Sequence, residues 1–300
     1  MPDFYTRPMS ELPIADGLAL YLHPQVLPAG PARGTVLIVH GLGEHGGRYD
    51  HVAAHLAQAG WAVARYDQRG HGRSGGPRGA IVRPDSLLTD LAAVIAHLKA
   101  AGSGGLPGPL VLLGHSMGGL VAGRFVAEGL APQPAPWWQA VDALVMSSPA
   151  LDPGMSAAQK LLLMLAAPLA PDVALGNGLQ PGWVCSDPAV VRAYIADPLN
   201  HDRVTPRLVR FIVDGGARVR QLAPQWRLPT LLLYAGADRC VAPSGSAGFA
   251  AAAPRQVLQA QCYSGMAHEI FNEPEQARVL ADLSAGLSSL TLPPNSPARA

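Results

Sequence analysis

The chain has 300 residues, a net charge of +1 and only 14% charged residues, so no basic stripe or acidic tail suggests a nucleic-acid partner. Three widely spaced cysteines form neither a disulfide framework nor a zinc pattern, so we expect a reducing, cytoplasmic compartment. The sequence has no signal-peptide pattern at its start, and no apolar run is long enough to span a membrane.

Short apolar runs alternate with helical patterns over residues 1–150. The apolar runs predict strands at 18–22, 35–39, 61–67, 111–113 and 141–146, and the helical spacing predicts helices at 49–59 and 87–98. Because strands that alternate with helices form parallel sheets, we expect an α/β fold. It should have a mostly parallel central sheet with helices on both faces.

The alternation stops from 151 to 225, where helical patterns at 160–167, 188–195 and 207–213, punctuated by proline and glycine, predict an inserted helical cap. It resumes with strands at 228–234 and 256–263 and a helix at 274–290. The expected domain organisation is an α/β core of residues 1–150 and 226–292, a cap of 151–225 and a disordered tail of 293–300.

The motif Gly-x-Ser-x-Gly spans Gly114 to Gly118 and follows an apolar strand. Small neighbours allow a serine to sit on a sharp strand-to-helix turn, which places its hydroxyl at the top of the sheet. The strand before the motif and the helical pattern after it supply the context that this reading needs. Ser116 is therefore the predicted nucleophile.

A serine hydroxyl needs a base, and the base needs an orienting carboxylate. Only His201 and His268 follow Ser116 in the chain, and His201 falls in the cap region. His268 lies in the loop after the last predicted strand, and Asp238 follows the preceding strand. Loops at the carboxyl ends of parallel strands gather at one edge, so Ser116, Asp238 and His268 form the predicted triad.

Two backbone amides are expected to hold the oxyanion. One belongs to Met117, which follows the nucleophile at the start of a helix, and the other to Leu42, in the loop after the strand 35–39. His40 at the end of that strand is interpreted as a structural hydrogen-bonding residue.

The same loop contains Gly41-x-Gly43-x-x-Gly46, and Asp67 ends the next strand. This pattern also fits a dinucleotide site, so a nicotinamide-dependent oxidoreductase is the alternative of another class. Glu44 argues against it, since a carboxylate inside the loop would repel a phosphate. His51 and His55 have the i, i+4 spacing of metal ligands, but no third ligand is evident and no metal is expected.

Several motifs resemble one branch of a known superfamily. They are His40-Gly41-Leu42-Gly43-Glu44-His45, Asp67-Gln68-Arg69-Gly70-His71-Gly72, Gly114-His115-Ser116-Met117-Gly118-Gly119, Gly236-Ala237-Asp238 and His268-Glu269. With them, the chain resembles the monoacylglycerol lipase and lysophospholipase branch of the α/β-hydrolases.

The resemblance implies a serine ester hydrolase with the triad Ser116, Asp238 and His268, oxyanion amides at Leu42 and Met117, and neither cofactor nor metal. It further implies that Glu44, His45, Arg48, Asp67 and Arg69 brace the oxyanion loop and its neighbour.

The expected partner is a small-molecule acyl ester or lipid, and the resemblance alone favours a monoacylglycerol. The same triad also serves general carboxylesterases, acyltransferases and peptidases. The segment Leu161–Leu165 of the cap either lines an acyl tunnel or faces a membrane transiently, or it packs the cap onto the core. The sequence leaves the oligomeric state open.

Overall fold

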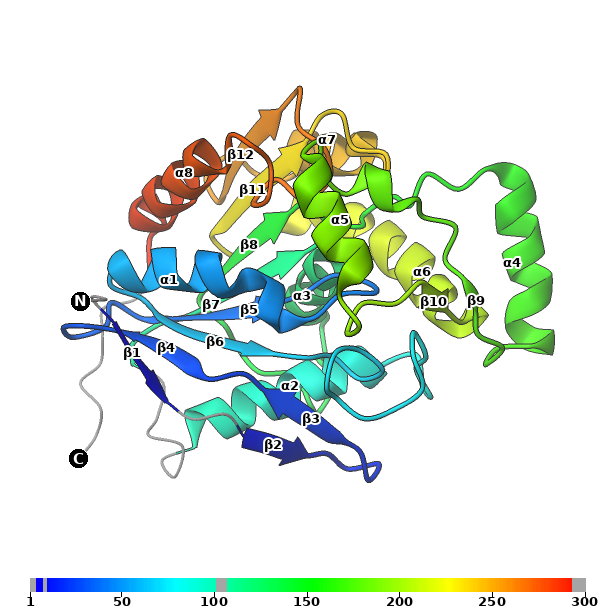
Figure 1. Cartoon of the computed structure of the whole chain (residues 1–300), viewed down its shortest axis with the longest axis horizontal. Coiled ribbons are helices and arrows are strands. Elements are labelled where there is room, and N and C mark those ends of the chain that lie inside the picture. The colour runs from blue at the N-terminus through cyan, green and yellow to red at the C-terminus, as the bar shows by residue number, and fades with distance from the viewer. Residues whose placement is uncertain (1–3, 8–9, 101–106, 293–300) are drawn as a thin grey trace.

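The computed structural model describes residues 4–7, 10–100 and 107–292, so the predicted tail at 293–300 lies outside the described residues (Figure 1). The strands are β1 (Phe4–Arg7), β2 (Ser10–Pro13), β3 (Ala19–Leu22), β4 (Gln25–Pro28), β5 (Thr35–Val39), β6 (Ala62–Tyr66), β7 (Leu110–His115), β8 (Ala143–Ser147), β9 (Leu175–Gly176), β10 (Arg203–Val204), β11 (Thr230–Ala235) and β12 (Leu258–Tyr263). The α-helices are α1 (Asp50–Gln58), α2 (Ser86–Lys99), α3 (Met117–Glu128), α4 (Ala157–Leu169), α5 (Pro188–Ala196), α6 (Pro206–Leu222), α7 (Pro243–Ala252) and α8 (Gln276–Ser289).

The central sheet has the strand order β1-β4-β6-β5-β7-β8-β11-β12, with β3 pairing both β6 and β2. From β6 to β12 neighbouring strands are parallel, whereas β1–β4 form antiparallel pairs at the other side. The prediction of a mostly parallel sheet is thus confirmed. The strand β2 was not predicted, because its residues are almost all exposed and carry no apolar pattern.

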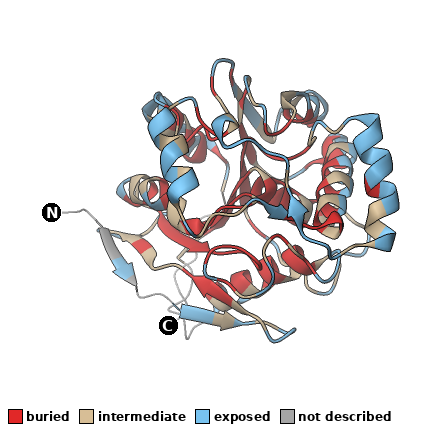
Figure 2. Cartoon of the chain, turned by 45° about the vertical axis from the view of Figure 1, so that its right-hand side comes forward, coloured by how far each residue is buried: buried red, intermediate tan, exposed pale blue. Residues whose placement is uncertain are grey.

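The parallel strands are buried on both faces. In β5, Val36 and Ile38 point into one apolar cluster, while Leu37 and Val39 point into the other, as the alternation of a strand requires. The helices α1 and α8 cover the first face, and α2, α3 and α6 cover the second. In Figure 2 the buried residues gather in the sheet between these two helical layers.

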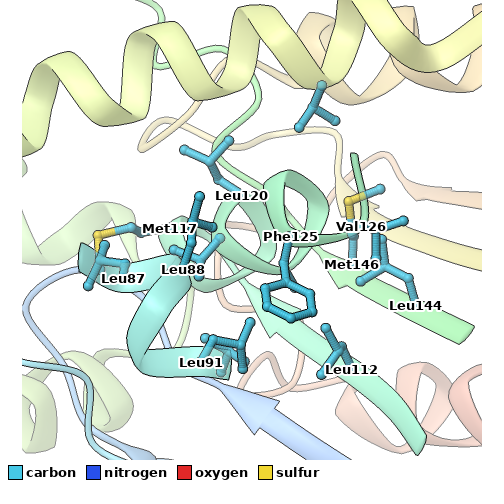
Figure 3. Close-up of a cluster of buried hydrophobic side chains, with 14 of the residues drawn as sticks. Leu87, Leu88, Leu91, Leu112, Met117, Leu120, Phe125, Val126, Leu144 and Met146 are labelled. Carbon is cyan, nitrogen blue, oxygen red and sulfur yellow. The ribbon is translucent and has the colours of Figure 1, made fainter. Parts of the chain in front are cut away.

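The second layer holds the nucleophile helix in place. Figure 3 shows Leu88 and Leu91 of α2, Leu120 and Phe125 of α3 and Leu112 of β7 converging on one cluster, and all are at most 2% exposed. Because these buried side chains pack against one another, α3 has little freedom to move. The start of α3, where the predicted nucleophile stands, is therefore fixed relative to the sheet.

The helix α6 is longer than the helix predicted at 207–213. Gly215 and Gly216 interrupt the apolar pattern, but their role is close packing. A Cβ on Gly216 would lie 2.4 Å from the carbonyl oxygen of Leu151, and one on Gly215 would lie 3.2 Å from Cγ of Arg124 in α3. The buried face of α6 packs on α3, although α6 falls inside the predicted cap range, and the boundary of the cap stays a prediction.

The helix α4 stands at the edge of the molecule (Figure 1). Of the segment Leu161–Leu165, only Leu163 is buried, while the other four residues are each more than half exposed. These four side chains therefore do not pack the segment onto the core. No helix among the described residues combines the length and the hydropathy needed to cross a bilayer.

Candidate active site

Ser116 stands between β7 and α3 in a backbone conformation that is rare for a residue with a side chain, with φ of 54° and ψ of −120°. Its amide donates to the carbonyl of Ser147 at 2.9 Å, and its own carbonyl accepts from Ala150 at 2.9 Å. The two motif glycines let the chains pass, since a Cβ on Gly114 would lie 2.3 Å from the carbonyl oxygen of Gly118. The expected strained turn is thus present at the expected residue.

Asp238 and His268 come from the loops after β11 and β12, and they meet at the carboxyl edge of the sheet. The carboxylate oxygen Oδ2 of Asp238 lies 2.6 Å from Nδ1 of His268. The other oxygen, Oδ1, accepts the amides of Cys240 at 2.8 Å and Val241 at 3.0 Å, which fix the carboxylate. Nδ1 is occupied by Asp238, so Nε2 is the ring nitrogen left for a reacting group.

The charge state of His268 depends on two opposing effects. Burial alone would lower the pKa of His268, but the Asp238 carboxylate raises it above its ordinary value. The neighbouring ring of His115 stands 4.8 Å away between centroids. Burial and the proximity of His268 lower the pKa of His115 to about 3, so His115 stays neutral at ordinary pH.

A cavity of about 230 Å³ brings three of the predicted site residues together: Leu42, Ser116 and His268. Gly41, Leu42, His115, Ser116 and His268 line its core side. Asp238 does not line it, because its side chain lies behind His268 and is 2% exposed. The cavity therefore exposes the predicted nucleophile and base to a ligand while the acid stays covered.

The loop after β5 lies against Ser116. A Cβ on Gly41 would be 3.1 Å from Cβ of Ser116 and 2.8 Å from Oε1 of Glu44, so only glycine fits there. The Leu42 amide donates no hydrogen bond to any described residue. Met117 is the first residue of α3, where amides have no partner inside the helix. Leu42 lines the cavity and Met117 directly follows Ser116, which also lines it, so the two predicted donors flank the predicted nucleophile with N–H groups that have no partner among the described residues.

Glu44 is the centre of the network that shapes this loop. Its Oε1 accepts the amide of Gly41 at 2.5 Å and the hydroxyl of Tyr49 at 2.7 Å, and its Oε2 accepts Arg48 at 2.7 Å. Burial would raise the pKa of Glu44, but Arg48 and the other partners lower it to about 2. Glu44 is therefore a buried carboxylate whose charge is compensated by its neighbours.

Residues of the predicted cap close the other side of the cavity. Asn177, Gln180 and Tyr194 line it, and no sequence pattern indicates them, because they follow no motif and come from separate segments. The ring of Tyr194 also covers the Arg48 guanidinium at 4.8 Å. Their convergence on one cavity is visible only in three dimensions.

The predicted cap contacts the loop after β5 at two points. Nε2 of His45 lies 2.9 Å from Oδ2 of Asp197, and the amide of His201 donates to the carbonyl of Gly43 at 2.9 Å. The ring of His201, the alternative base, is used structurally: its Nε2 lies 3.1 Å from the carbonyl oxygen of Gly70, and its Nδ1 accepts the amide of Arg203.

The rings of His51 and His55 also form hydrogen-bond contacts within the fold. Nε2 of His51 lies 2.9 Å from the carbonyl oxygen of Phe271, and Nε2 of His55 lies 2.8 Å from Oγ of Ser284. These contacts tie α1 to the last part of the chain. The i, i+4 spacing of the two histidines is thus explained by packing.

The loop that suggested a dinucleotide site is filled by protein groups. The amide of Gly41 already donates a hydrogen bond to the Glu44 carboxylate. Both oxygens of Asp67 are engaged: Oδ1 accepts the amide of Gly46 at 2.8 Å and lies 2.6 Å from His23, and Oδ2 accepts the amide of Arg73. Asp67 braces the loop, as the resemblance implied.

Comparison with known proteins agrees with this geometry. The family model described as serine aminopeptidase, S33 matches residues 30–275. The monoacylglycerol lipase of Mycolicibacterium smegmatis is 34% identical over 260 residues, which cover 86% of this chain and 89% of that protein. None of these findings supports a nicotinamide-dependent oxidoreductase.

Two solved structures are also similar. The Paleococcus ferrophilus monoacylglycerol lipase is 32% identical with a TM-score of 0.78, covering 90% of this chain and 98% of that one. A soluble variant of Saccharomyces cerevisiae monoglyceride lipase, solved with a substrate analogue, has a TM-score of 0.77 over 95% and 94% of the two chains. Its 21% identity supports the fold alone. The chain belongs to the serine aminopeptidase S33 family, in the monoacylglycerol lipase branch of the α/β-hydrolases, and is a serine ester hydrolase of that type.

Proposed function

We propose that the protein hydrolyses monoacylglycerols through an acyl-enzyme intermediate on Ser116, with Asp238 and His268 completing the triad. The observation that carries the proposal is the 2.6 Å contact between Asp238 and His268 beside a cavity that also exposes Ser116. The identity of 34% to a protein named a monoacylglycerol lipase supports the substrate class.

In the first step, Nε2 of His268 takes the hydroxyl proton as Oγ of Ser116 attacks the ester carbonyl carbon. Asp238 holds the Nδ1–H tautomer and stabilises the imidazolium that forms. The carbonyl oxygen becomes an oxyanion and accepts hydrogen bonds from the amides of Leu42 and Met117.

The tetrahedral intermediate then collapses. The carbon–oxygen bond to the alcohol breaks, and His268 gives its proton to the departing alkoxide, so that glycerol leaves and Ser116 carries the acyl group. Water loses a proton to His268 and attacks this ester, and the reverse proton transfer releases the fatty acid and the free serine. No cofactor or metal takes part in this proposed scheme.

We further propose that the cap contacts a lipid surface transiently through α4, from which the water-insoluble substrate enters. Leu161, Leu162, Met164 and Leu165 expose 57–66% of their surface, which is unusual for four large apolar residues in one short segment. An exposed apolar helix face of this kind favours the boundary between lipid headgroups and acyl chains.

The test is the rate of hydrolysis of monoacylglycerols and p-nitrophenyl esters of increasing chain length by the wild type, Ser116→Ala and the control Ser264→Ala. We expect Ser116→Ala to lose on the order of 10⁴-fold or more in kcat and the control, in an exposed loop, to match the wild type. Full activity in Ser116→Ala would overturn the mechanism. Activity on aminoacyl amides but on no ester would overturn the substrate class and leave the triad standing.

A further inference from the structure

A second groove, of about 540 Å³, lies where α4, α6 and α3 meet, and it shares no lining residue with the cavity around Ser116. Four arginines line it: Arg124 of α3 and Arg207, Arg210 and Arg218 of α6. The α6 arginines and Asp214 follow each other at spacings of three or four residues, so they share one face of the helix. Asp214 is the only acid among the described residues of the lining.

The arginines differ in how their charge is compensated. Three have a carboxylate partner: Arg207 with Asp172 at 2.9 Å, Arg210 with Asp214 at 2.5 Å and Arg124 with Glu128 at 3.7 Å. Arg218 has none among the described residues, and its Nη1 donates to the neutral amide oxygen of Gln221 at 3.2 Å. The groove therefore contains a guanidinium without a counter-charge.

Arg218 also acts on a second arginine. Burial lowers the pKa of the Arg124 guanidinium, Glu128 offsets part of this, and the positive charge of Arg218 lowers it further. Two like charges that face one groove repel each other, and an anion between them would remove that repulsion. Guanidinium groups bind phosphate oxygens in a forked geometry, which makes phosphate the best-fitting anion.

The groove opens next to the apolar helix α4. Ala167 of α4 lines the groove, and Leu161, Leu162 and Leu165 of the same helix are among its exposed leucines. Figure 2 shows this helix as a largely exposed ribbon at the edge of the molecule. Apolar side chains beside a cluster of cations complement a bilayer that carries negative headgroups.

We propose that the arginine groove, defined by Arg124, Arg207, Arg210 and Arg218, binds the phosphate headgroup of an anionic phospholipid in the bilayer that α4 contacts. This inference rests on the membrane contact of the proposed function. It adds a second, charge-dependent interaction that orients the protein on the surface. The groove takes no part in ester cleavage.

The experiment is co-sedimentation with vesicles of phosphatidylcholine alone and with phosphatidylglycerol added. It compares the wild type, the groove variant Arg210→Gln/Arg218→Gln and the control variant Arg227→Gln/Arg255→Gln. Both variants lose two positive charges, but Arg227 and Arg255 are exposed outside the groove. Each groove arginine near an anionic surface adds about 5-fold in binding, so we expect the groove variant to lose about 25-fold on anionic vesicles. The control variant should lose far less.

A third variant, Leu162→Gln/Leu165→Gln, separates this inference from the apolar contact on which it rests. This variant should bind both vesicle types more weakly, by the same factor. If it binds neutral vesicles as tightly as the wild type does, the α4 contact alone is overturned. Equal losses in the groove and control variants would overturn the groove. Stabilisation by soluble glycerol 3-phosphate, without any preference for anionic vesicles, would assign the site to a free phosphate and also overturn the proposal. Unchanged hydrolysis of a soluble short-chain ester shows that each variant is folded.

Discussion

Arg48 forms a forked ion pair with Glu269, with Nη1 2.6 Å from Oε1 and Nη2 2.7 Å from Oε2. The same guanidinium donates to Glu44, whose carboxylate holds the amide of Gly41. Glu269 directly follows His268 in the chain. One cation therefore joins the loop of the predicted oxyanion hole to the loop of the predicted base.

Replacement of this cation tests the connection. Arg48→Met would leave the carboxylates of Glu44 and Glu269 buried without a partner, and we expect the free energy of unfolding to fall by about 3–5 kcal/mol. Urea unfolding followed by circular dichroism measures it. The control is Arg83→Met, whose pair with Asp85 is about half exposed, and whose loss should cost at most about 1 kcal/mol. Equal losses in the two variants would contradict a buried connection at Arg48.

The Arg48–Glu269 pair also shows how far local sequence patterns predict a site. Gly-x-Ser-x-Gly, Asp238 and His268 were identified because their spacing relative to strand ends has a local physical reason. The partner of Arg48 lies 221 residues away, and no local pattern connects the two. Motifs identified the loops, but only the folded chain shows which side chains join them.

The limits of local patterns are clearest in α6 and the cap. Gly215 and Gly216 suggest the end of a helix, yet they lie inside one, where Gly216 packs closely against the carbonyl of Leu151 and Gly215 against Arg124 of α3. Asn177 and Gln180 line the cavity from a segment with no periodic pattern. Predictions were reliable where burial imposes a period on the sequence, and they failed where tertiary contacts override local preference.

The acid limb of the pH profile is set by His268. Only the neutral imidazole accepts the Ser116 proton, so kcat/KM should fall as the pH drops through the pKa of His268. Since Asp238 raises this pKa despite burial, the midpoint should lie above about 6.5, the ordinary value for histidine. Hydrolysis of a soluble short-chain ester between acidic and neutral pH measures it. A midpoint well below the ordinary value would contradict the compensation by Asp238.

Asp238→Asn tests how the charge of the acid controls His268. The amide carries no negative charge, so burial of His268 is no longer opposed and the midpoint of the acid limb should move to lower pH. Loss of the correct tautomer should also lower kcat by about 10⁴-fold. The same measurement over the pH range gives both quantities. A variant with reduced kcat but an unmoved midpoint would show that Asp238 does not control the charge of His268.

Two glycines of α3 make a matched test of the strained turn. A Cβ on Gly118 would lie 2.0 Å from the carbonyl oxygen of Val39, whereas a Cβ on Gly123 would meet nothing closer than Sδ of Met146 at 3.4 Å. Gly118→Ala should therefore force the nucleophile turn away from β5 and lower the free energy of unfolding by about 3 kcal/mol or more.

Gly123→Ala should instead stabilise the protein by about 0.5–1 kcal/mol, because alanine loses less backbone entropy in a helix. Thermal unfolding of both variants, with kcat on a soluble ester, decides between the expectations. The packing of α3 predicts a rise in Tm for Gly123→Ala with unchanged kcat, and a fall in both for Gly118→Ala. Equal Tm values for the two variants would mean that the turn tolerates a side chain. Ser116 would then be held by contacts other than the close approach of Gly118 to β5.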